Sequence, residues 1–197
     1  METTGEMPGW IHKHKAELFE KDSTILLTGG TIERGENLSL IENIDDWQLD
    51  LQTRVWKCVA KRDWPRWEVS REDNRSNSLW EIRQALWSFN VGWKEDYEES
   101  LLRLEDELGM IPDVKSVESL YRPAIVHEPL PDQEEEYDIY RIIVEKTVVR
   151  YVEDSHCVQI TVEGELPELT VRHLVEDVRE KLSKLENRKY VAAKIAV

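Results

Sequence analysis

Two threonines in the segment ILLTGGTIERG, residues 25–35, carry hydroxyls that could act as nucleophiles: Thr28 and Thr31. A threonine hydroxyl attacks a carbonyl carbon efficiently only when a positioned base takes up its proton. The two residues between them, Gly29 and Gly30, also favour a tight turn, because glycine adopts a positive φ at no steric cost. The segment therefore has two interpretations, a catalytic loop or a hairpin turn.

The stretch ILLTGGTI resembles the N-terminal signature of the L-asparaginase family, in which a threonine attacks an amide carbon. The resemblance implies Thr28 or Thr31 as the nucleophile, together with a His-Gly-Thr-Asp-Thr type segment and a lysine further along the chain. The sequence contains no such segment, and Glu33 stands where that family has a small residue. We therefore predict a Gly-Gly hairpin between two strands, and no catalytic residue.

Residues suited to metal binding or to other nucleophilic chemistry are sparse. His12 and His14 would share one face of a strand and could bind one metal ion, whereas in a helix they would point apart and could not. In either case the spacing supplies no third ligand. Cys58 and Cys157 are far apart in the sequence, which indicates two reduced thiols rather than a disulfide or a metal site. A glycine-rich phosphate loop is absent. We predict no metal, no cofactor, and surface positions for the remaining histidines, which are His127, His156 and His173.

Tryptophan is the most informative residue type in this sequence. All eight tryptophans precede residue 94, namely Trp10, Trp47, Trp56, Trp64, Trp67, Trp80, Trp87 and Trp93. Tryptophan fills core volume in small domains, and together with tyrosine and arginine it also dominates the hot spots of protein interfaces. We expect most of these rings in the core and a binding cluster formed by Trp64, Arg66, Trp67, Trp80 and Trp87.

Charge narrows the classes of partner. The net charge is −15, with 41 acidic against 26 basic residues. A field of this sign repels phosphate backbones and anionic lipids, so we predict no direct nucleic-acid binding and favour a basic protein partner. No run of 18 apolar residues occurs, and the first residues lack the pattern of a secretory signal. The sequence thus predicts a cytoplasmic protein that does not enter the membrane.

The distribution of tryptophan and proline predicts three parts in an α+β protein. Residues 1–109 form a Trp-rich part with antiparallel strands and helices, and residues 110–138 a connector rich in proline and acidic residues. Residues 139–197 form a small β-β-α-β domain. Its last strand, within residues 189–197, could pair with that of a second copy, so a homodimer stays open.

Local patterns place the elements. The first part has a helix near residues 12–19, strand-like segments at 24–32, 37–42, 46–51 and 65–70, and an ambiguous segment at 54–60. Ser78 and Glu81 have capping-box spacing before a helix that ends near Phe89, and a second helix spans about 96–108. In the last part, residues 139–152 are typical of one long strand, and 169–185 carry a helical apolar stripe.

The segments DDWQLDLQT, residues 45–53, and SLWEIRQALWSF, residues 78–89, resemble small bacterial immunity proteins, which have a Trp-led strand and a short helix ending near Phe and Trp. Asp45, Asp46 and Trp47 stand where that family has an Asn-Pro-Gly-Trp turn. The resemblance implies an acidic inhibitor that neutralises its partner.

Taken together, these features favour a non-catalytic acidic module, such as an inhibitor, an immunity-type protein or an accessory subunit, that binds a basic protein. Three alternatives remain open. They are a hydrolase whose site forms only in the fold, a carbohydrate or small-ligand binder that uses tryptophan faces, and a mimic of nucleic-acid charge.

Overall fold

The computed structural model describes residues 2–34, 39–122, 128–129 and 139–195. These residues form helices and mainly antiparallel β-sheets, with one parallel pair between β1 and β8, so the protein belongs to the α+β class, as predicted. The chain divides into two compact units, Met1–Trp64 (unit 1) and Pro65–Val197 (unit 2). Among the described residues, none of the helices is long and apolar enough to cross a bilayer.

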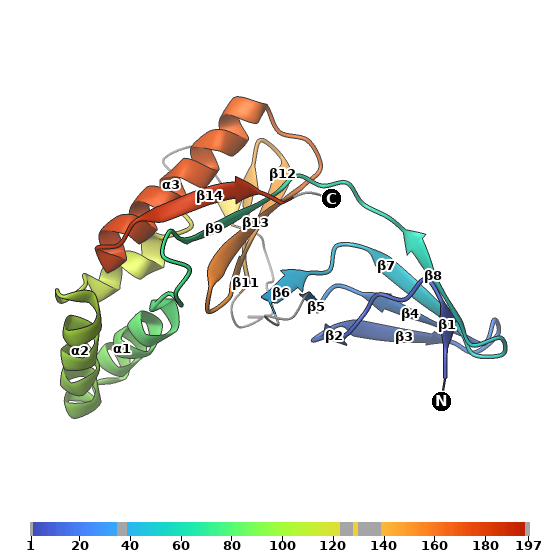
Figure 1. Ribbon diagram of the computed structural model, residues 1–197, viewed down its shortest axis with the longest axis horizontal. Coiled ribbons are helices and arrows are strands. Elements are labelled where there is room, and N and C mark those ends of the chain that lie inside the picture. The colour runs from blue at the N-terminus through green and yellow to red at the C-terminus, as the bar shows by residue number, and fades with distance from the viewer. Residues whose placement is uncertain (1, 35–38, 123–127, 130–138, 196–197) are drawn as a thin grey trace. The chain divides into compact units, whose positions relative to one another are not determined.

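Unit 1 consists of short strands in two sheets (Figure 1). One sheet has the order β1-β8-β7-β4-β3 and the other the order β2-β5-β6. The strands are β1 (Thr4–Gly5), β2 (Ile11–His12), β3 (Lys15–Phe19), β4 (Thr24–Thr28), β5 (Thr31–Arg34), β6 (Ser39–Glu42), β7 (Asp46–Asp50) and β8 (Val55–Ala60). The ambiguous segment 54–60 is therefore a strand, and the helix predicted near 12–19 is wrong, because those residues pair in β2 and β3.

The Thr-Gly-Gly-Thr segment is a bend between the two sheets. β4 pairs with β3 and β7, whereas β5 pairs with β2 and β6, so the predicted hairpin is wrong. Gly29 and Gly30 have φ values of +64° and +81°. The side chain of Asn43 donates to the Gly29 carbonyl at 2.9 Å, and the Asn43 backbone N–H donates to that of Gly30 at 2.8 Å. The positive φ values thus explain why glycine occupies both positions, without a catalytic role for the segment.

Unit 2 has one six-stranded antiparallel sheet in the order β10-β11-β12-β13-β9-β14. Its elements are β9 (Arg66–Arg71), α1 (Leu79–Val91), α2 (Lys94–Leu108), the 3₁₀ helix η1 (Val114–Ser119), β10 (Glu128–Pro129), β11 (Ile139–Val144), β12 (Thr147–Glu153), β13 (Cys157–Glu163), α3 (Glu168–Glu186) and β14 (Tyr190–Lys194). Figure 1 shows α3 lying along one face of this sheet.

The division of the chain differs from the predicted boundary at residue 109. β9, from the segment assigned to the first part, lies between β13 and β14, and both α1 and α2 belong to unit 2. A local pattern identifies β9 as a strand but cannot show which sheet it joins. Within the predicted connector, 110–138, residues 114–119 form η1, whereas the acidic run 134–136 lies outside the described residues.

The segment 139–152 is a hairpin, not one long strand. β11 and β12 pair from Ile139↔Val152 to Val144↔Thr147, and the turn residues Glu145 and Lys146 have positive φ. Two-residue hairpin turns with positive φ at both positions match the twist of the flanking strands. This turn contains no glycine and the residues on both sides are rich in β-branched types, so the sequence pattern predicted one strand instead of two. The order of the last part is therefore β-β-β-α-β.

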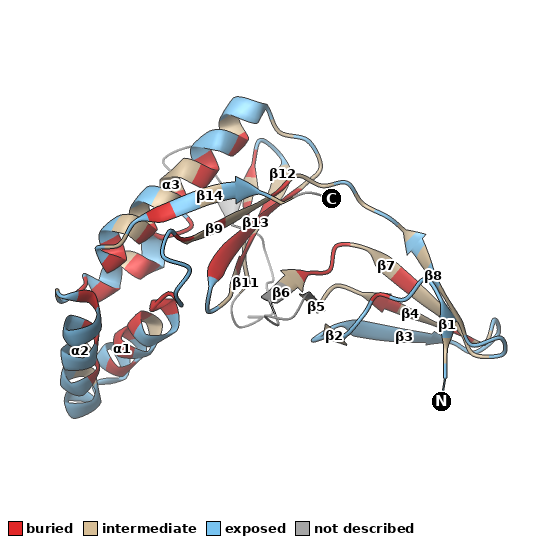
Figure 2. Cartoon of the chain, viewed as in Figure 1, coloured by how far each residue is buried: buried red, intermediate tan, exposed pale blue. Residues whose placement is uncertain are grey.

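The core of unit 2 lies between the sheet and the helices. Along α3 every position of the predicted stripe is buried, namely Val171, Leu174, Val175, Val178, Leu182 and Leu185. They belong to the same buried cluster as the sheet residues Val69 and Ile160, which are fully buried. Figure 2 shows buried positions on both α3 and the sheet. β14 occupies one edge of the sheet, as expected for the terminal strand. Its pairing with a second copy stays a prediction.

The two glycines of the bend offer a matched pair of variants. A Cβ on Gly30 would lie 2.3 Å from the His12 carbonyl oxygen, whereas one on Gly29 would meet nothing within 4 Å. Both substitutions carry the left-handed strain of about 1 kcal/mol. We expect Gly30→Ala to lower the free energy of unfolding of unit 1 by about 3 kcal/mol or more, and Gly29→Ala by about 1 kcal/mol. Hydrogen exchange of the Trp47 indole and the β4 amides measures the free energy of unfolding of both variants. Equal decreases for Gly30→Ala and Gly29→Ala would contradict the prediction.

Candidate functional site

The five residues predicted to form a binding cluster are not equally accessible. Trp64 ends unit 1 and is half-buried, with the Arg62 guanidinium 5.2 Å from its ring centroid. Arg66 is buried on β9, and Trp67 packs partly buried against the core of unit 2. Trp80 and Trp87 are 65% and 46% exposed on α1. The exposed part of the predicted cluster is therefore α1.

The start of α1 is held by glutamates that lie far away in sequence. Ser78 is the N-cap residue, but its hydroxyl donates to Glu107 Oε1 at 2.9 Å, and it makes no side-chain cap bond within α1. The Ser78 backbone N–H donates to Glu186 Oε1 at 2.9 Å. The predicted capping box with Glu81 is therefore wrong, because α2 and the end of α3 supply the carboxylates at this position.

Glu186 is a fully buried carboxylate at the end of α3. Its Oε2 accepts a hydrogen bond of 2.7 Å from the Tyr190 hydroxyl, and its Oε1 accepts the bond from Ser78. Burial raises the pKa of Glu186 above its ordinary value, although both hydrogen bonds and the nearby Arg71 act in the opposite direction. The carboxyl group thus joins α3, β14 and the start of α1.

The end of α1 places a further tryptophan. Gly92 has φ +81°, and its N–H donates to the Phe89 carbonyl while the Trp93 N–H donates to the Ser88 carbonyl. This is the Schellman arrangement, which terminates a helix in one defined geometry. It holds the Trp93 ring 4.7 Å from that of Trp87, in an edge-to-face contact with an interplanar angle of 80°.

Four apolar side chains on α1 and directly after its end are exposed to solvent. Trp80, Trp87 and Val91 follow helical spacing along one side of α1, and Trp93 follows its end. They are 65%, 46%, 46% and 53% exposed, respectively. We call these four residues the α1 tryptophan surface. Large apolar side chains gathered on a surface mark contact sites for other molecules.

The helix next to this surface is strongly acidic. α2 contacts α1 and follows directly after Trp93. Only Lys94 and Arg103 provide positive charge on α2. Its acidic residues are Glu95, Asp96, Glu98, Glu99, Glu105, Asp106 and Glu107. Glu95 and Asp96 line one hollow together with Trp93 and Lys94, so acidic residues lie next to the α1 tryptophan surface. Such charge complements a basic surface.

A cavity of about 370 Å³ lies at the start of α1. One wall is residues 76–81, apart from Ser78, and the other is Glu153–Ser155 at the end of β12 and the turn after it. The Asn77 backbone N–H donates to the Ser155 carbonyl and its side chain donates to the Asp154 carbonyl, each at 2.7 Å. These two bonds hold the walls together.

Glu153 is 7% exposed and is neutralised from within the protein. Arg83 donates to its two oxygens at 2.7 and 2.5 Å, and the Tyr121 hydroxyl donates to Oε1 at 2.6 Å. The Arg83 guanidinium also lies 4.5 Å from the centroid of the Tyr140 ring. Burial lowers the pKa of Arg83, but the bond to Glu153 outweighs it and the pKa is raised. This ion pair holds Glu153, one of the lining residues of the cavity, in place.

The histidines do not form a catalytic arrangement among the described residues. Ser155 Oγ lies 2.8 Å from His156 Nδ1, and Asp154 Oδ1 lies 3.7 Å from that same nitrogen. A Ser-His-Asp triad requires the hydroxyl and the carboxylate at different ring nitrogens. His12 Nε2 lies 2.8 Å from Glu33 Oε1. His173 is exposed, and His127 lies outside the described residues.

The candidate site contains residues that the sequence did not single out for binding, namely Val91, Trp93, Glu153 and Asp154. The position of Trp93 could have been inferred from sequence, because a hydrophobic residue directly after the C-terminal glycine of a helix commonly packs against the last helical turn. The acidic pair Glu153 and Asp154 carried none, since carboxylates are frequent throughout this chain. Only the approach of the turn after β12 to the start of α1 distinguishes this pair from the others.

No protein-family model, curated protein or solved structure matches this chain. Its function is therefore inferred from the geometry of the described residues.

The raised pKa of Glu186 makes stability depend on pH. The folded protein binds this proton more tightly than the unfolded chain, so the contribution is complete below the unfolded pKa of about 4.5 and falls as pH rises towards the folded value. We expect Glu186→Gln to flatten this decrease above pH 4.5, measured by urea unfolding across pH. Glu105→Gln, at an exposed position on α2, should leave the slope unchanged; parallel slopes for both variants would refute the assignment.

The two cysteines should differ in reactivity. Burial raises the pKa of Cys157 to about 12, and it also raises that of the half-buried Cys58, where Asp45 adds to the effect. Because the thiolate is the reacting species, both should alkylate slowly in the native protein. We expect Cys58 to react with iodoacetamide at least about tenfold faster than Cys157, followed by peptide mass spectrometry. Faster labelling of Cys157 would indicate a nucleophilic thiol and overturn this view.

Proposed function

We propose that this protein is a non-catalytic acidic module that binds a basic protein, as an inhibitor, an immunity-type protein or an accessory subunit does. The α1 tryptophan surface contacts the partner, and the carboxylates of α2 steer it into place. The observation that carries the proposal is the exposure of Trp80, Trp87 and Val91 along one side of α1, and of Trp93 just after its end.

Two physical features support this assignment. Tryptophan contributes a large contact area with few rotatable bonds, so it loses little conformational entropy on binding. The net charge of −15 and the acidic residues of α2 raise the association rate with a basic partner and disfavour acidic ones. Of the five residues predicted from sequence, the proposal retains Trp80 and Trp87 as contact residues.

The alternative functions receive less support. Stacking on sugar rings uses coplanar aromatic faces, whereas Trp87 and Trp93 are nearly perpendicular at 80°. A hydrolase needs a base that is correctly placed for its nucleophile, and both partners of His156 lie at the same nitrogen. The geometry of the described residues therefore favours an interface over either a sugar platform or a hydrolytic site.

The test compares two exposed tryptophan positions. Tagged protein is used for affinity capture from extract of the cell that makes it, at low and moderate salt, and the stoichiometric basic protein is purified for calorimetry. We expect Trp87→Ala to raise the dissociation constant at least about tenfold, because hot-spot tryptophans contribute about 2 kcal/mol or more. The affinity should also fall as salt rises.

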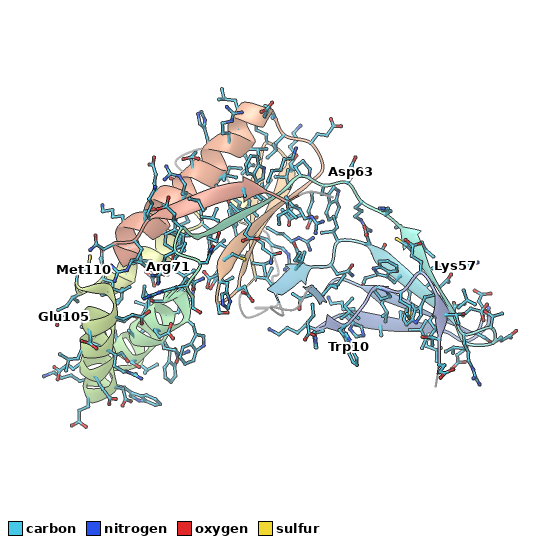
Figure 3. The ribbon with its side chains drawn as sticks, viewed as in Figure 1. Trp10, Lys57, Asp63, Arg71, Glu105 and Met110 are labelled. Atoms are coloured by element: carbon cyan, nitrogen blue, oxygen red, sulfur yellow. The ribbon has the colours of Figure 1, made fainter. Side chains whose placement is uncertain are left out.

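The control is Trp10→Ala, which truncates a 77% exposed tryptophan of unit 1 (labelled in Figure 3). It should leave the affinity unchanged, since Trp10 lies outside the α1 tryptophan surface. Equal losses from both variants would show that α1 is not the contact surface. Absence of any basic protein at either salt concentration would refute the proposed function.

A further inference from the structure

The cavity at the start of α1 has the dimensions and the chemistry of a site for one side chain. Its volume of about 370 Å³ is near the lower end for ligand pockets. Asn77 joins its two walls through both its backbone and its side chain. The arrangement is thus preformed, which reduces the entropy lost when a ligand binds.

The lining favours a cation. Its ionisable residues are Glu81, Glu153 and Asp154, and the described lining contains no basic side chain. The negative charge of Glu153 is already balanced by Arg83, which leaves Glu81 and Asp154 as the other two acidic residues of the lining. Asp154 Oδ1 also accepts a hydrogen bond of 3.1 Å from the His156 backbone N–H. The Asp154 side chain is 16% exposed, so its interactions are screened less than those of a surface carboxylate.

The apolar part of the lining suits a planar cation. Trp80 is a lining residue of the cavity, next to Leu79, and it is 65% exposed, so its indole is accessible to a ligand. A guanidinium stacks on an indole face and donates from two nitrogens to one carboxylate. An ammonium is a compact, strongly hydrated charge that does not combine both contacts as well.

We propose that this cavity binds the guanidinium group of an arginine side chain of the basic partner. The proposal deepens the proposed function and rests on it, because Trp80 belongs both to the cavity and to the α1 tryptophan surface. The arginine stacks on Trp80 and donates to Glu81 and Asp154, while the neighbouring surface of the partner covers Trp87 and Trp93. The cavity then selects one basic side chain, and the apolar surface supplies contact area.

The test uses butylguanidinium as the probe, followed in two-dimensional NMR spectra of the full-length protein. We expect saturable shifts of the Trp80 indole N–H and of the amides of residues 153–155. Butylammonium at the same ionic strength should bind at least about threefold more weakly. The absence of saturable shifts, or equal binding of butylguanidinium and butylammonium, would overturn the proposal.

Variants distinguish the cavity from general electrostatic attraction. The double variant Glu81→Gln, Asp154→Asn retains side-chain size and the backbone carbonyl that Asn77 contacts, and we expect it to weaken butylguanidinium at least about tenfold. Trp80→Leu retains apolar volume without the aromatic face and should also weaken binding. A matched removal of acidic charge on α2, Glu98→Gln with Glu105→Gln, should leave binding unchanged. If the α2 variant weakens butylguanidinium binding as much as the cavity variant does, the binding depends on net charge alone and the proposal is overturned.

The outcomes separate this inference from the proposed function. If Trp87→Ala weakens the partner but the probe does not bind, the interface stands and the arginine site is refuted. If the probe binds as expected, Trp87→Ala should leave that binding unchanged, because Trp87 does not line the cavity. If in addition no basic protein is captured, the cation site stands while its assignment to a partner's arginine is refuted together with the proposed function.

Discussion

A single buried carboxylate, Glu186, connects the parts of unit 2 that carry the candidate site. Burying a carboxylate costs several kcal/mol unless hydrogen bonds compensate it. Here Tyr190 and Ser78 provide two, and the charge of Arg71 lies nearby. Arg71 itself is buried and binds Asp73 and the Ser76 carbonyl. The loop before α1, and hence the direction of the helix, depends on this network.

The candidate site is rigid at both ends of α1. At the start, Ser78 is bound by Glu107 and Glu186, and Asn77 joins the cavity walls. At the end, the Schellman motif at Gly92 holds Trp93 against Trp87. Preorganised side chains lose little entropy on association, so exposed tryptophans in such a frame can give high affinity from a modest area. The same frame explains why apolar rings stay exposed: the other side of α1 already fills the core.

In the proposed interface, charge and apolar area would have separate roles. The net charge and the acidic residues of α2 would act at long range and mainly affect the association rate and its salt dependence. In the proposed arginine site, the partly buried carboxylate of Asp154 would act at short range and distinguish one basic group from another. The tryptophan rings contribute contact area regardless of charge. An interface built in this way recognises a basic surface first and a particular side chain second.

Sequence by itself determined the features that depend on neighbouring residues: the α+β class, the apolar stripe of α3 and the helices after Ser78. It also determined the acidic charge and pointed to Trp80 and Trp87. Tertiary structure decided which sheet β9 joins, that Gly29 and Gly30 bend the chain between sheets, and that Glu186 rather than Glu81 holds the start of α1. These outcomes depend on contacts between residues far apart in sequence, and their free energy comes from burial and from hydrogen bonds that no local pattern records.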